Sequence, residues 1–462
     1  GKGTKAMATL TAADPNYRRE LGDGLIQRWS TAEDTENIAQ LCGFVFRDKE
    51  DEPLNIHAVV SVRRHMSGDF PLMGPGDYAV IEDMHKEGNP LVACTCLWRQ
   101  EWEYEGIVFG VGQPEFVVTL PEYRNRGLIR ALFEMLHTRS EAEGHLVQVI
   151  TGIPYFYRQF GYEYALELDG RRVTYLSLIP QAQASTAEPY TLRATTYEDI
   201  PALRELYKRQ CSGSMVSSIA TERYWRYQVE EEPDPKIGKQ ICVKMIVDNA
   251  GAVQGYVMAS MRRWGSSVTV YGLNLAAGVN WQAVVPSLLR ALQAYGMQIP
   301  AMGSDTPPLN AISFALGSKH PLYEALGETL APLYELPYAW YVRVPDVLAF
   351  VRHIAPALER RLANSVAAGY TGELTLNFFR GGLRMVFDRG RITRIEPWRA
   401  PAYKSDADAT CPALVFLQLL FGYRGLDELR SAFPDVSIEK HDAEVLLNAL
   451  FPKKLSLVML LG

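Results

Sequence analysis

A short pattern that occurs twice constrains the fold of this chain of 462 residues. The two copies carry the same residue types at the same spacing: Arg28, Thr31, Glu33 and Asp34, then Arg193, Thr196, Glu198 and Asp199. Each copy is typical of a strand followed by a helix. The threonine is the expected N-cap, and the acidic residues fall in the first turn, where free N–H groups and the helix dipole favour negative charge. This repeat predicts two related domains in tandem.

Changes in composition indicate the domain borders. At roughly 150 residues per domain we expect about three domains. We predict a first domain at residues 8–180 and a second at residues 188–345, joined by a linker rich in Ala, Gln, Ser, Thr and Pro. Residues 346–462 combine helical segments with alternating strands across Gly-containing turns, the pattern of an antiparallel meander. This third domain is similar to the sterol-carrier-protein fold, so the expected class is α/β (α+β).

Charge and hydropathy exclude several functions. A formal net charge of −6 argues against nucleic acid as a partner bound by overall electrostatics. There is no run of about 18 apolar residues and no signal-peptide core, so we expect a cytoplasmic protein with no membrane partner. The six cysteines and eight histidines are scattered, and the one close pair, Cys94 and Cys96, lies in an alternating strand pattern. We therefore expect no metal.

The segment around Gly127 carries the strongest chemical signal. Phe116 to Thr119 are expected to form a strand, and an apolar helical face follows Gly127 until Gly144. Between them lies the basic turn Arg124-Asn125-Arg126-Gly127-Leu128-Ile129, with Arg130 just beyond it. The N–H groups at a helix start and its positive dipole end attract anions, and a glycine leaves the main chain open to close approach. The pattern predicts a pyrophosphate site; a solvated basic turn is the alternative.

This turn resembles motif A of the GNAT superfamily of N-acetyltransferases, Q/R-x-x-G-x-G/A, although Ile129 stands where Gly or Ala is usual. In that superfamily the turn holds the pyrophosphate of coenzyme A, and the preceding strand pairs with the pantetheine arm. The resemblance implies acetyl-CoA as co-substrate. The contacts it implies are Val117, Val118 and Thr119 on the strand, Arg124, Asn125, Arg126, Gly127, Leu128, Ile129 and Arg130 in the turn and helix start, and Gly152 and Ile153 after the next strand.

The segment from Tyr157 to Tyr162 narrows the resemblance, because it is similar to the YxxFGY segment of the Eis (enhanced intracellular survival) acetyltransferases. That family has two tandem GNAT domains, the second without coenzyme, and a sterol-carrier-like third domain. The corresponding turn of the second copy, LAAGVNW at residues 275–281, lacks arginine, so we expect a scaffold there. The resemblance implies transfer of an acetyl group to an amine of a small cationic acceptor, such as an aminoglycoside, and a homo-hexamer.

Acetyl transfer needs a donor for the developing oxyanion, an acid and a base. Backbone N–H groups of Val117 to Thr119 are candidate donors. The resemblance implies that Tyr157 is the acid that protonates the leaving thiolate, whereas a core tyrosine is the alternative. For the base, it implies the C-terminal carboxylate, which is on Gly462 if the natural chain ends there. Glu115 is the other candidate, because many GNAT enzymes use a strand carboxylate acting through water.

Two other functions share parts of this pattern. A lipid- or sterol-binding carrier with vestigial GNAT domains would use the third domain. A protein lysine or N-terminal acetyltransferase would share every coenzyme contact and differ in its acceptor groove. The sequence does not identify the acceptor amine.

Overall fold

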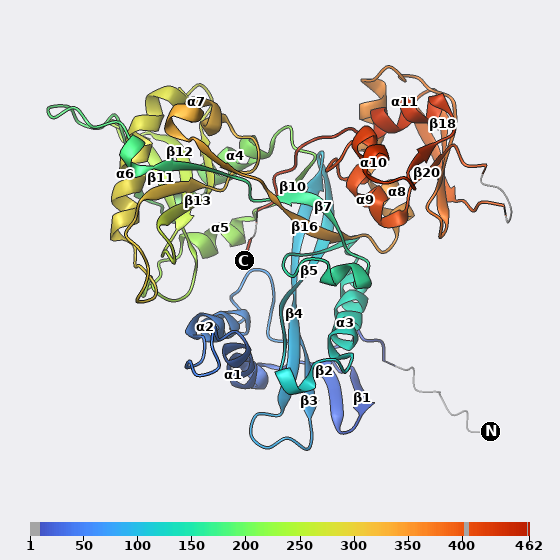
Figure 1. Ribbon diagram of the computed structural model, residues 1–462, viewed down its shortest axis with the longest axis horizontal. Coiled ribbons are helices and arrows are strands. Elements are labelled where there is room, and N and C mark those ends of the chain that lie inside the picture. Colours follow the sequence, from blue (N-terminus) through green and yellow to red (C-terminus); the bar gives the residue numbers. More distant parts are fainter. Residues whose placement is uncertain (1–9, 402–405, 460) are drawn as a thin grey trace. The chain divides into compact units, whose positions relative to one another are not determined.

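The computed structural model describes residues 10–401, 406–459 and 461–462 (Figure 1). Its contacts divide the chain into two compact units. The first unit comprises residues up to Leu166 together with Trp340–Leu455, and the second comprises Glu167–Ala339 together with Ser456–Gly462. This division follows contacts and does not test the three predicted domains, 8–180, 188–345 and 346–462, which stay a prediction.

The first unit contains a long mixed sheet with the strand order β1-β2-β3-β4-β5-β6-β16-β7. The strands are β1 (Arg18–Gly22), β2 (Leu25–Trp29), β3 (Tyr78–Asp83), β4 (Leu91–Tyr104), β5 (Ile107–Thr119), β6 (Val147–Ile150), β7 (Glu163–Leu168) and β16 (Tyr338–Arg343). β4 and β5 form a long antiparallel pair, and β16 pairs antiparallel with β6. The chain therefore returns to this sheet about two hundred residues after β6.

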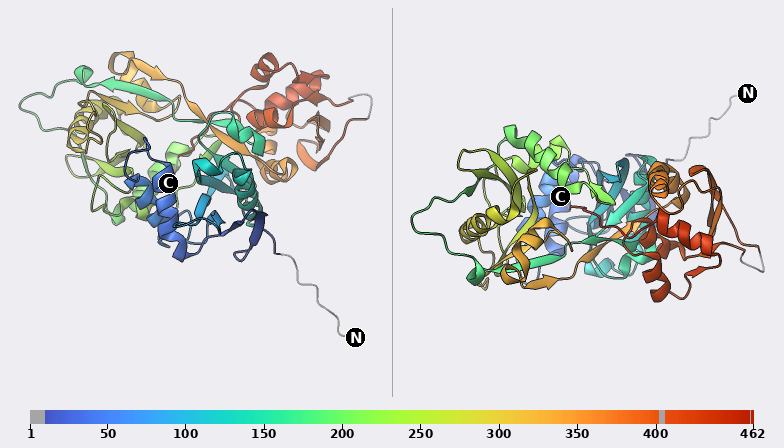
Figure 2. Two further views of the ribbon diagram at one scale, coloured as in Figure 1. Left: turned by 60° about the horizontal axis from the view of Figure 1, so that its bottom comes forward. Right: turned by 90° about the horizontal axis from the view of Figure 1, so that it is seen from above.

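Helices cover both faces of this sheet: α1 (Thr35–Val45), α2 (Ile56–His65) and α3 (Leu128–Ala142). In Figure 1 α3 runs along one face of β4 and β5, and α1 and α2 lie on the other face. Figure 2 (left) shows the dark-blue helices and the turquoise helix on opposite sides of the light-blue strands. The buried face of α3 consists of Leu128, Leu132, Met135 and Leu136, at the spacing of one helical stripe. The helix ends before Gly144, which has φ +85, as predicted.

The rest of the first unit is a second sheet with the order β19-β18-β17-β20-β21 and four helices. The elements are α8 (Val347–Ala363), β17 (Gly372–Asn377), β18 (Gly382–Asp388), β19 (Arg391–Pro397), β20 (Ala409–Thr410), α9 (Ala413–Leu420), α10 (Leu426–Ala432), β21 (Ser437–Ile438) and α11 (His441–Leu450). β17, β18 and β19 are consecutive and antiparallel, which confirms the predicted meander.

The second unit has its own sheet, with the order β15-β8-β14-β13-β12-β11-β9. The strands of this sheet are β8 (Arg171–Tyr175), β9 (Tyr190–Ala194), β11 (Ile241–Asp248), β12 (Val253–Ser260), β13 (Ser267–Leu275), β14 (Ala311–Phe314) and β15 (Leu333–Glu335). The short strand β10 (Val216–Ser218) also belongs to this unit but lies outside the sheet. Its helices are α4 (Ile200–Cys211), α5 (Glu222–Val229), α6 (Trp281–Gln298) and α7 (Pro321–Leu330). Its core contains apolar side chains from β11, β12, β13, β14, α6 and α7.

The repeated sequence pattern has the same local geometry in both units. Arg28 donates to both carboxylate oxygens of Asp34 at 2.8 Å, and the N–H of Thr31 donates to Asp34 Oδ2. Arg193 and Asp199 make the same two bonds at 2.8 Å. The predicted helix is preceded in each case by a short 3-10 turn, η1 (Ala32–Asp34) and η5 (Tyr197–Asp199), because the aspartate folds back onto the N-cap backbone.

Candidate active site

Strand β5 leaves one of its edges open beside β6. β5 pairs with β4 as far as Thr119, but it pairs with β6 only at Val111↔Val147 and Gly112↔Gln148. Beyond Gly112 the two parallel strands separate, so the main-chain groups of the second half of β5 have no strand partner on that side among the described residues. The candidate donors Val117 to Thr119 lie in this half of the strand.

A β-bulge lies in the same half of β5. The register passes from Cys96↔Glu115 to Cys94↔Val118, so two residues of β5 oppose Thr95 alone. Phe116 takes the extra place with φ +50, a left-handed conformation that costs a non-glycine residue about 1–3 kcal/mol. Strain of this kind is typical of functional sites and persists because the surrounding sheet holds it.

A backbone hydrogen bond of Leu120, the residue after β5, shows toward which edge the last N–H groups of the strand point. The N–H of Leu120 donates to the Val92 carbonyl at 2.9 Å, toward β4. Because the N–H groups of successive strand residues point to alternate edges, that of Val118 also faces β4. The N–H groups of Val117 and Thr119 therefore point to the open edge, where an extended ligand could pair with them.

The turn after β5 presents further free donors. Gly127 is the N-cap of α3 with φ +73 and ψ +16, and Asn125 is also left-handed, with φ +63. No side chain caps the helix, and the first helical hydrogen bond is made by Ala131 N–H to the Gly127 carbonyl. Within the described part of the chain the N–H groups of residues 125–130 have no partner. A Cβ at Gly127 would meet no atom within 4 Å, so the space above the turn is open.

The arginines of the turn keep their charge unneutralised. Arg124, Arg126 and Arg130 are exposed, and in the described ranges none of them pairs with a carboxylate. Arg126 lies over the ring of Tyr123 at 4.9 Å, and Arg130 donates to Gln159 Oε1 at 3.3 Å. Three exposed guanidiniums beside six free N–H groups form a strongly anion-attracting surface.

Ile129 departs from the motif without blocking the turn. Its side chain is half-buried and packs with Val117, Phe156 and Phe160 around the buried ring of Tyr157. A branched side chain is accepted at this position because the aromatic cluster provides an apolar environment on the inner side of the helix. Leu128 is buried in the main core of the sheet.

Tyr157 lies on the short helix η3 (Phe156–Phe160) with its ring buried. The ring stacks on Phe133 at 5.7 Å and meets Tyr341 edge-on at 5.6 Å. Its hydroxyl makes no hydrogen bond to any described residue. Burial raises the pKa of Tyr157 to about 12, and the negative charge of Glu115 adds to the shift. The phenol is therefore a protonated donor at neutral pH, within the electrostatic range of Glu115.

Two further predicted contacts follow β6. Gly152 has φ +137, and a Cβ there would lie 3.7 Å from the Tyr157 ring. Ile153 is 60% exposed, and its carbonyl accepts a hydrogen bond from Tyr341 at 3.3 Å. The fold thus brings β5, the basic turn, the residues after β6 and Tyr157 into one region of the first unit.

Glu115 precedes the bulge and has an unusual carboxyl group. Burial raises its pKa to about 7, although hydrogen bonds from Gln113 and from the Phe116 N–H act in the opposite direction. Gln113 Nε2 donates to Glu115 Oε1 at 2.8 Å. A carboxyl group with a pKa near neutrality can exchange protons in both directions, which suits a general base.

Gly462 lies in the second unit and is exposed. The tail before it runs beside β10, where the Leu457 N–H donates to the Val216 carbonyl at 2.8 Å and the Met459 N–H donates to Ser218 Oγ at 3.0 Å. The side chains of Val458, Met459 and Leu461 are buried. The role of the Gly462 carboxylate stays a prediction.

In the second unit, β13, a turn and α6 correspond to β5, the basic turn and α3. Here, however, main-chain groups at the strand edge and at the helix start already have partners within the protein. The Ala276 N–H donates to the Gln254 carbonyl at 2.7 Å, as Leu120 does to Val92. At the start of α6 the Asn280 side chain accepts from the N–H groups of Gln282 and Ala283.

His320 Nε2 donates to the carbonyl of Leu273 on β13 at 2.9 Å. Leu273 lies three residues before Ala276, so it corresponds to Val117, which lies three residues before Leu120. Burial lowers the pKa of His320 to about 4, so its ring is neutral at pH 7. Both groups that a coenzyme would need, the strand edge and the helix start, already have protein partners here.

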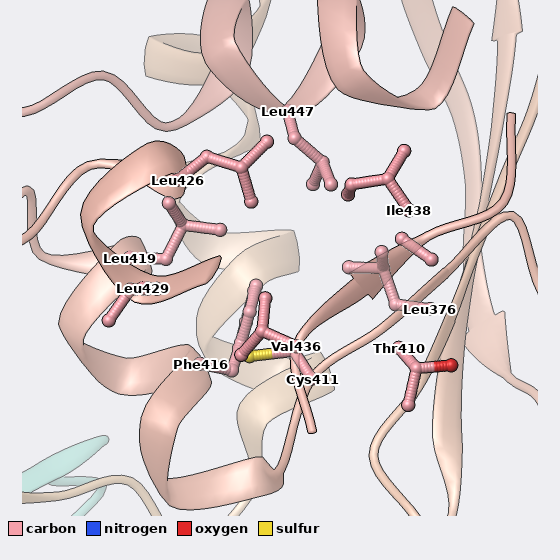
Figure 3. A pocket seen from close by; sticks show the side chains of 11 residues that line it. Leu376, Thr410, Cys411, Phe416, Leu419, Leu426, Leu429, Val436, Ile438 and Leu447 are labelled. Atoms are coloured by element: carbon pink, nitrogen blue, oxygen red, sulfur yellow. The ribbon is translucent and has the colours of Figure 1, made fainter. Parts of the chain in front are cut away.

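A separate apolar cavity lies in the β17–β21 region (Figure 3). Leu447 and Leu426 from the helices point toward Leu376 and Ile438 from the sheet, and Phe416 and Cys411 lie below them. The volume left free between these side chains is about 10 Å³, enough for about one water molecule. Among the described residues no group of three or more His, Cys, Asp or Glu could hold a metal ion, and no helix is both long and apolar enough to cross a bilayer.

Comparison with known proteins agrees with this geometry. Residues 27–165 match the family of the acetyltransferase (GNAT) domain. The chain therefore carries a GNAT acetyltransferase domain, and the protein is an enzyme of the acyltransferase class. GNAT domains use acetyl-CoA or another acyl-CoA as co-substrate. No curated protein sequence matches the chain.

Solved structures share the fold along nearly the whole chain. A GCN5-related N-acetyltransferase from Kribbella flavida is 18% identical with a TM-score of 0.63, over 95% of this chain and 98% of that one. Another from Anabaena variabilis is 14% identical with a TM-score of 0.64, over 94% and 99%. Eis1 from Mycobacterium abscessus is 14% identical with a TM-score of 0.56, over 93% and 98%. At these identities the likeness shows the fold alone.

Proposed function

We propose that this protein is an acetyl-CoA-dependent N-acetyltransferase that modifies a primary amine of a small cationic acceptor, such as an aminoglycoside. The observation that carries the proposal is the row of free N–H groups at residues 125–130, beside unpaired arginines and the open edge of β5. A doubly charged pyrophosphate would satisfy these donors, and the pantetheine arm would pair with Val117 and Thr119.

The chemistry is direct attack. The acceptor ammonium loses a proton to the base, and its nitrogen attacks the thioester carbonyl carbon to form the new C–N bond. The N–H of Val117 supports the oxyanion, because it points to the open edge. The C–S bond then breaks, the coenzyme A thiolate takes the proton of Tyr157, and the second proton that the new amide nitrogen releases restores the phenol. The free hydroxyl and high pKa of Tyr157 support this role, because the phenol stays protonated until the thiolate forms.

Two carboxylates are candidates for the base. Glu115 is supported by its pKa of about 7 and by its electrostatic interaction with Tyr157. The C-terminal carboxylate on Gly462 is the alternative, supported by the buried side chains of Val458, Met459 and Leu461 that precede it. A Glu115→Gln variant and a variant extended by two glycines beyond Gly462 separate them. The variant that loses the pH-dependent rise in turnover identifies the base.

We also propose that the second unit is a second GNAT-type domain that acts as a scaffold. Asn280 and His320 occupy the donors and the strand edge that a coenzyme would use. One coenzyme per chain is the expected stoichiometry. The assembly proposed by resemblance is a homo-hexamer, with neither nucleic acid nor membrane as partner, in the cytoplasm; light scattering of the purified protein tests the hexamer.

The test is turnover of acetyl-CoA, followed as free thiol, over a panel of amines, aminoglycosides and lysine peptides. Wild type is compared with Tyr157→Phe, and Tyr155→Phe is the matched control, because Tyr155 is adjacent and 76% exposed. Acetylation of peptides alone would favour a protein acetyltransferase. If no amine releases thiol and coenzyme A does not bind, the proposal is wrong.

The apolar lining of the cavity in the β17–β21 region supports one second candidate, a lipid carrier, whose cavity would have to widen to admit a fatty acid. Thermal melting with acetyl-CoA and with fatty acids distinguishes the two functions. A carrier is stabilised only by the fatty acids, whereas the proposed enzyme is stabilised by acetyl-CoA.

A further inference from the structure

A chain of side-chain hydrogen bonds crosses from β4 to β5 and ends on Glu115. Trp102 Nε1 donates to Gln100 Oε1 at 3.0 Å. Gln100 Nε2 donates to Gln113 Oε1 at 2.5 Å, and Gln113 Nε2 donates to Glu115 Oε1 at 2.8 Å. Gln100 and Trp102 lie on one face of β4, and Gln113 and Glu115 lie on the same face of β5, because residues two apart share a face.

The Trp102 indole determines which group donates and which accepts in each of these hydrogen bonds. An indole N–H can only donate, so Gln100 must turn its oxygen toward Trp102 and its amide NH₂ toward Gln113. Gln113 must then accept through its oxygen and present its own NH₂ to Glu115. The orientation of each amide follows from the chemistry of the first donor, although amide oxygen and nitrogen are hard to tell apart by shape.

The chain is held in place because its first and third members, Trp102 and Gln113, are buried, while Gln100 between them is half-buried. Trp102 is 0% exposed and Gln113 is 1% exposed, so water does not compete for their bonds. The Trp102 ring is held edge-on by Trp340 at 5.5 Å and by Phe109 at 6.4 Å. A flipped Gln113 would turn its carbonyl oxygen against the Glu115 carboxylate and would leave the Gln100 NH₂ without an acceptor, so the observed arrangement is strongly preferred.

We propose that Trp102, Gln100 and Gln113 are positioning residues that hold Glu115 by its Oε1, together with the hydrogen bond from the Phe116 N–H, so that the carboxylate is oriented to accept the proton from the acceptor amine. This inference rests on the proposed function, with Glu115 as base. The donor from Gln113 also favours the ionised carboxylate, which burial opposes. The hydrogen-bond chain Trp102–Gln100–Gln113, called the relay below, therefore keeps the desolvated carboxylate of Glu115 ionisable near neutral pH.

The direction of the expected shift in the pH profile follows from the role of Glu115 as a general base. A general base works when deprotonated, so kcat/KM rises with pH through the pKa of Glu115. Loss of the Gln113 donor removes an interaction that lowers this pKa, so the rising limb moves to higher pH. The other titratable groups that interact with Glu115 among the described residues are Cys96 on β4 and Tyr157 on η3. Both are protonated across this range, because burial raises the pKa of each.

The experiment measures pH profiles of kcat/KM for four variants. Gln113→Leu should move the rising limb up by about one pH unit and lower activity about fivefold at pH 7, with recovery above pH 9. Trp102→Phe keeps a buried ring but removes the first donor, so it should shift the limb in the same direction by less. Trp98→Phe is the matched control, because the Trp98 indole N–H is buried on the same strand without a hydrogen-bond partner among the described residues. It should leave the limb in place.

Glu115→Gln separates failure of the inference from failure of the proposed function. If this variant keeps the rising limb, Glu115 is not the base and the proposed function fails in that part. If Glu115→Gln loses the rising limb of the pH profile while Gln113→Leu and Trp102→Phe keep the wild-type profile, Glu115 is the base. The proposed role of the relay is then wrong. A carbon-13 NMR titration of glutamate carboxyls, with Glu115→Gln for assignment, reads the same shift without catalysis. It decides the question if a variant is inactive but folded.

Discussion

Replacement of Gly127 by alanine separates the backbone role of this glycine from its role in coenzyme binding. Gly127 has φ +73, a conformation that costs an L-residue about 1–2 kcal/mol. Alanine also restricts the unfolded chain, which returns about 0.4–1 kcal/mol. The net destabilisation is therefore about 1 kcal/mol, or roughly 2–4 °C in Tm. No clash adds to it, because a Cβ there meets no atom within 4 Å.

The same Cβ would occupy the space in which a pyrophosphate meets the helix start. Loss of one or two hydrogen bonds to a charged group, at about 1.5–3 kcal/mol each, raises the Kd for coenzyme A at least about tenfold. Gly144 provides the matched control, since it ends the same helix with φ +85 and equally open space. Gly144→Ala should lower Tm as much and leave the Kd unchanged. Equal Kd values for coenzyme A in calorimetric titrations of the two variants would refute the pyrophosphate site at Gly127.

Three further predictions concern the charges and the acid. Replacement of the three turn arginines by glutamine should raise KM for acetyl-CoA about tenfold or more and leave KM for S-acetylpantetheine, which lacks the pyrophosphate, unchanged; equal effects on both substrates contradict a phosphate role. Tyr157→Phe should lower kcat by about 10²-fold or more, while Tyr155→Phe changes it less than about twofold. Because burial raises the pKa of Tyr157 to about 12, wild-type kcat should show no fall due to this group up to pH 10. Asp34→Asn should lower the free energy of unfolding of the first unit by about 2 kcal/mol at pH 7 in urea titrations.

The pH dependence of the Asp34 effect has a definite sign. Burial raises the pKa of Asp34, but the hydrogen bonds from Arg28 and Thr31 outweigh burial, so the folded pKa lies below the unfolded value. The stabilisation is present above the unfolded pKa and is lost as pH falls through the folded one. The difference between wild type and Asp34→Asn should therefore shrink toward pH 3. A difference that stays constant would mean that the charge is not the cause.

Local patterns predicted the elements of the site because the chemistry is encoded in neighbouring residues. The strand before Thr119, the helix after Gly127 and its end at Gly144 follow from apolar spacing and glycine placement. The Arg28 and Asp34 pattern gave the strand and helix of each copy, although the 3-10 turn between them depends on how the carboxylate folds back.

The features that sequence reasoning missed depend on strand register. Gln100 and Gln113 are thirteen residues apart and meet only because β4 and β5 pair with Trp98 opposite Gln113. The alternation of polar residues at Gln113 and Glu115 was the available signal, but it does not reveal a partner on β4. The bulge is carried by Phe116, a residue type that gives no sign of a positive φ. The return of β16 beside β6 is equally invisible to local patterns.

Hydrogen–deuterium exchange with and without coenzyme A tests the central claim most directly, because it observes the main-chain N–H groups themselves. We predict slower exchange at Val117, at Thr119 and at residues 125–130 when coenzyme A is present, and no protection at the start of α6. Saturable binding of coenzyme A that leaves exchange at residues 125–130 unchanged would contradict the account.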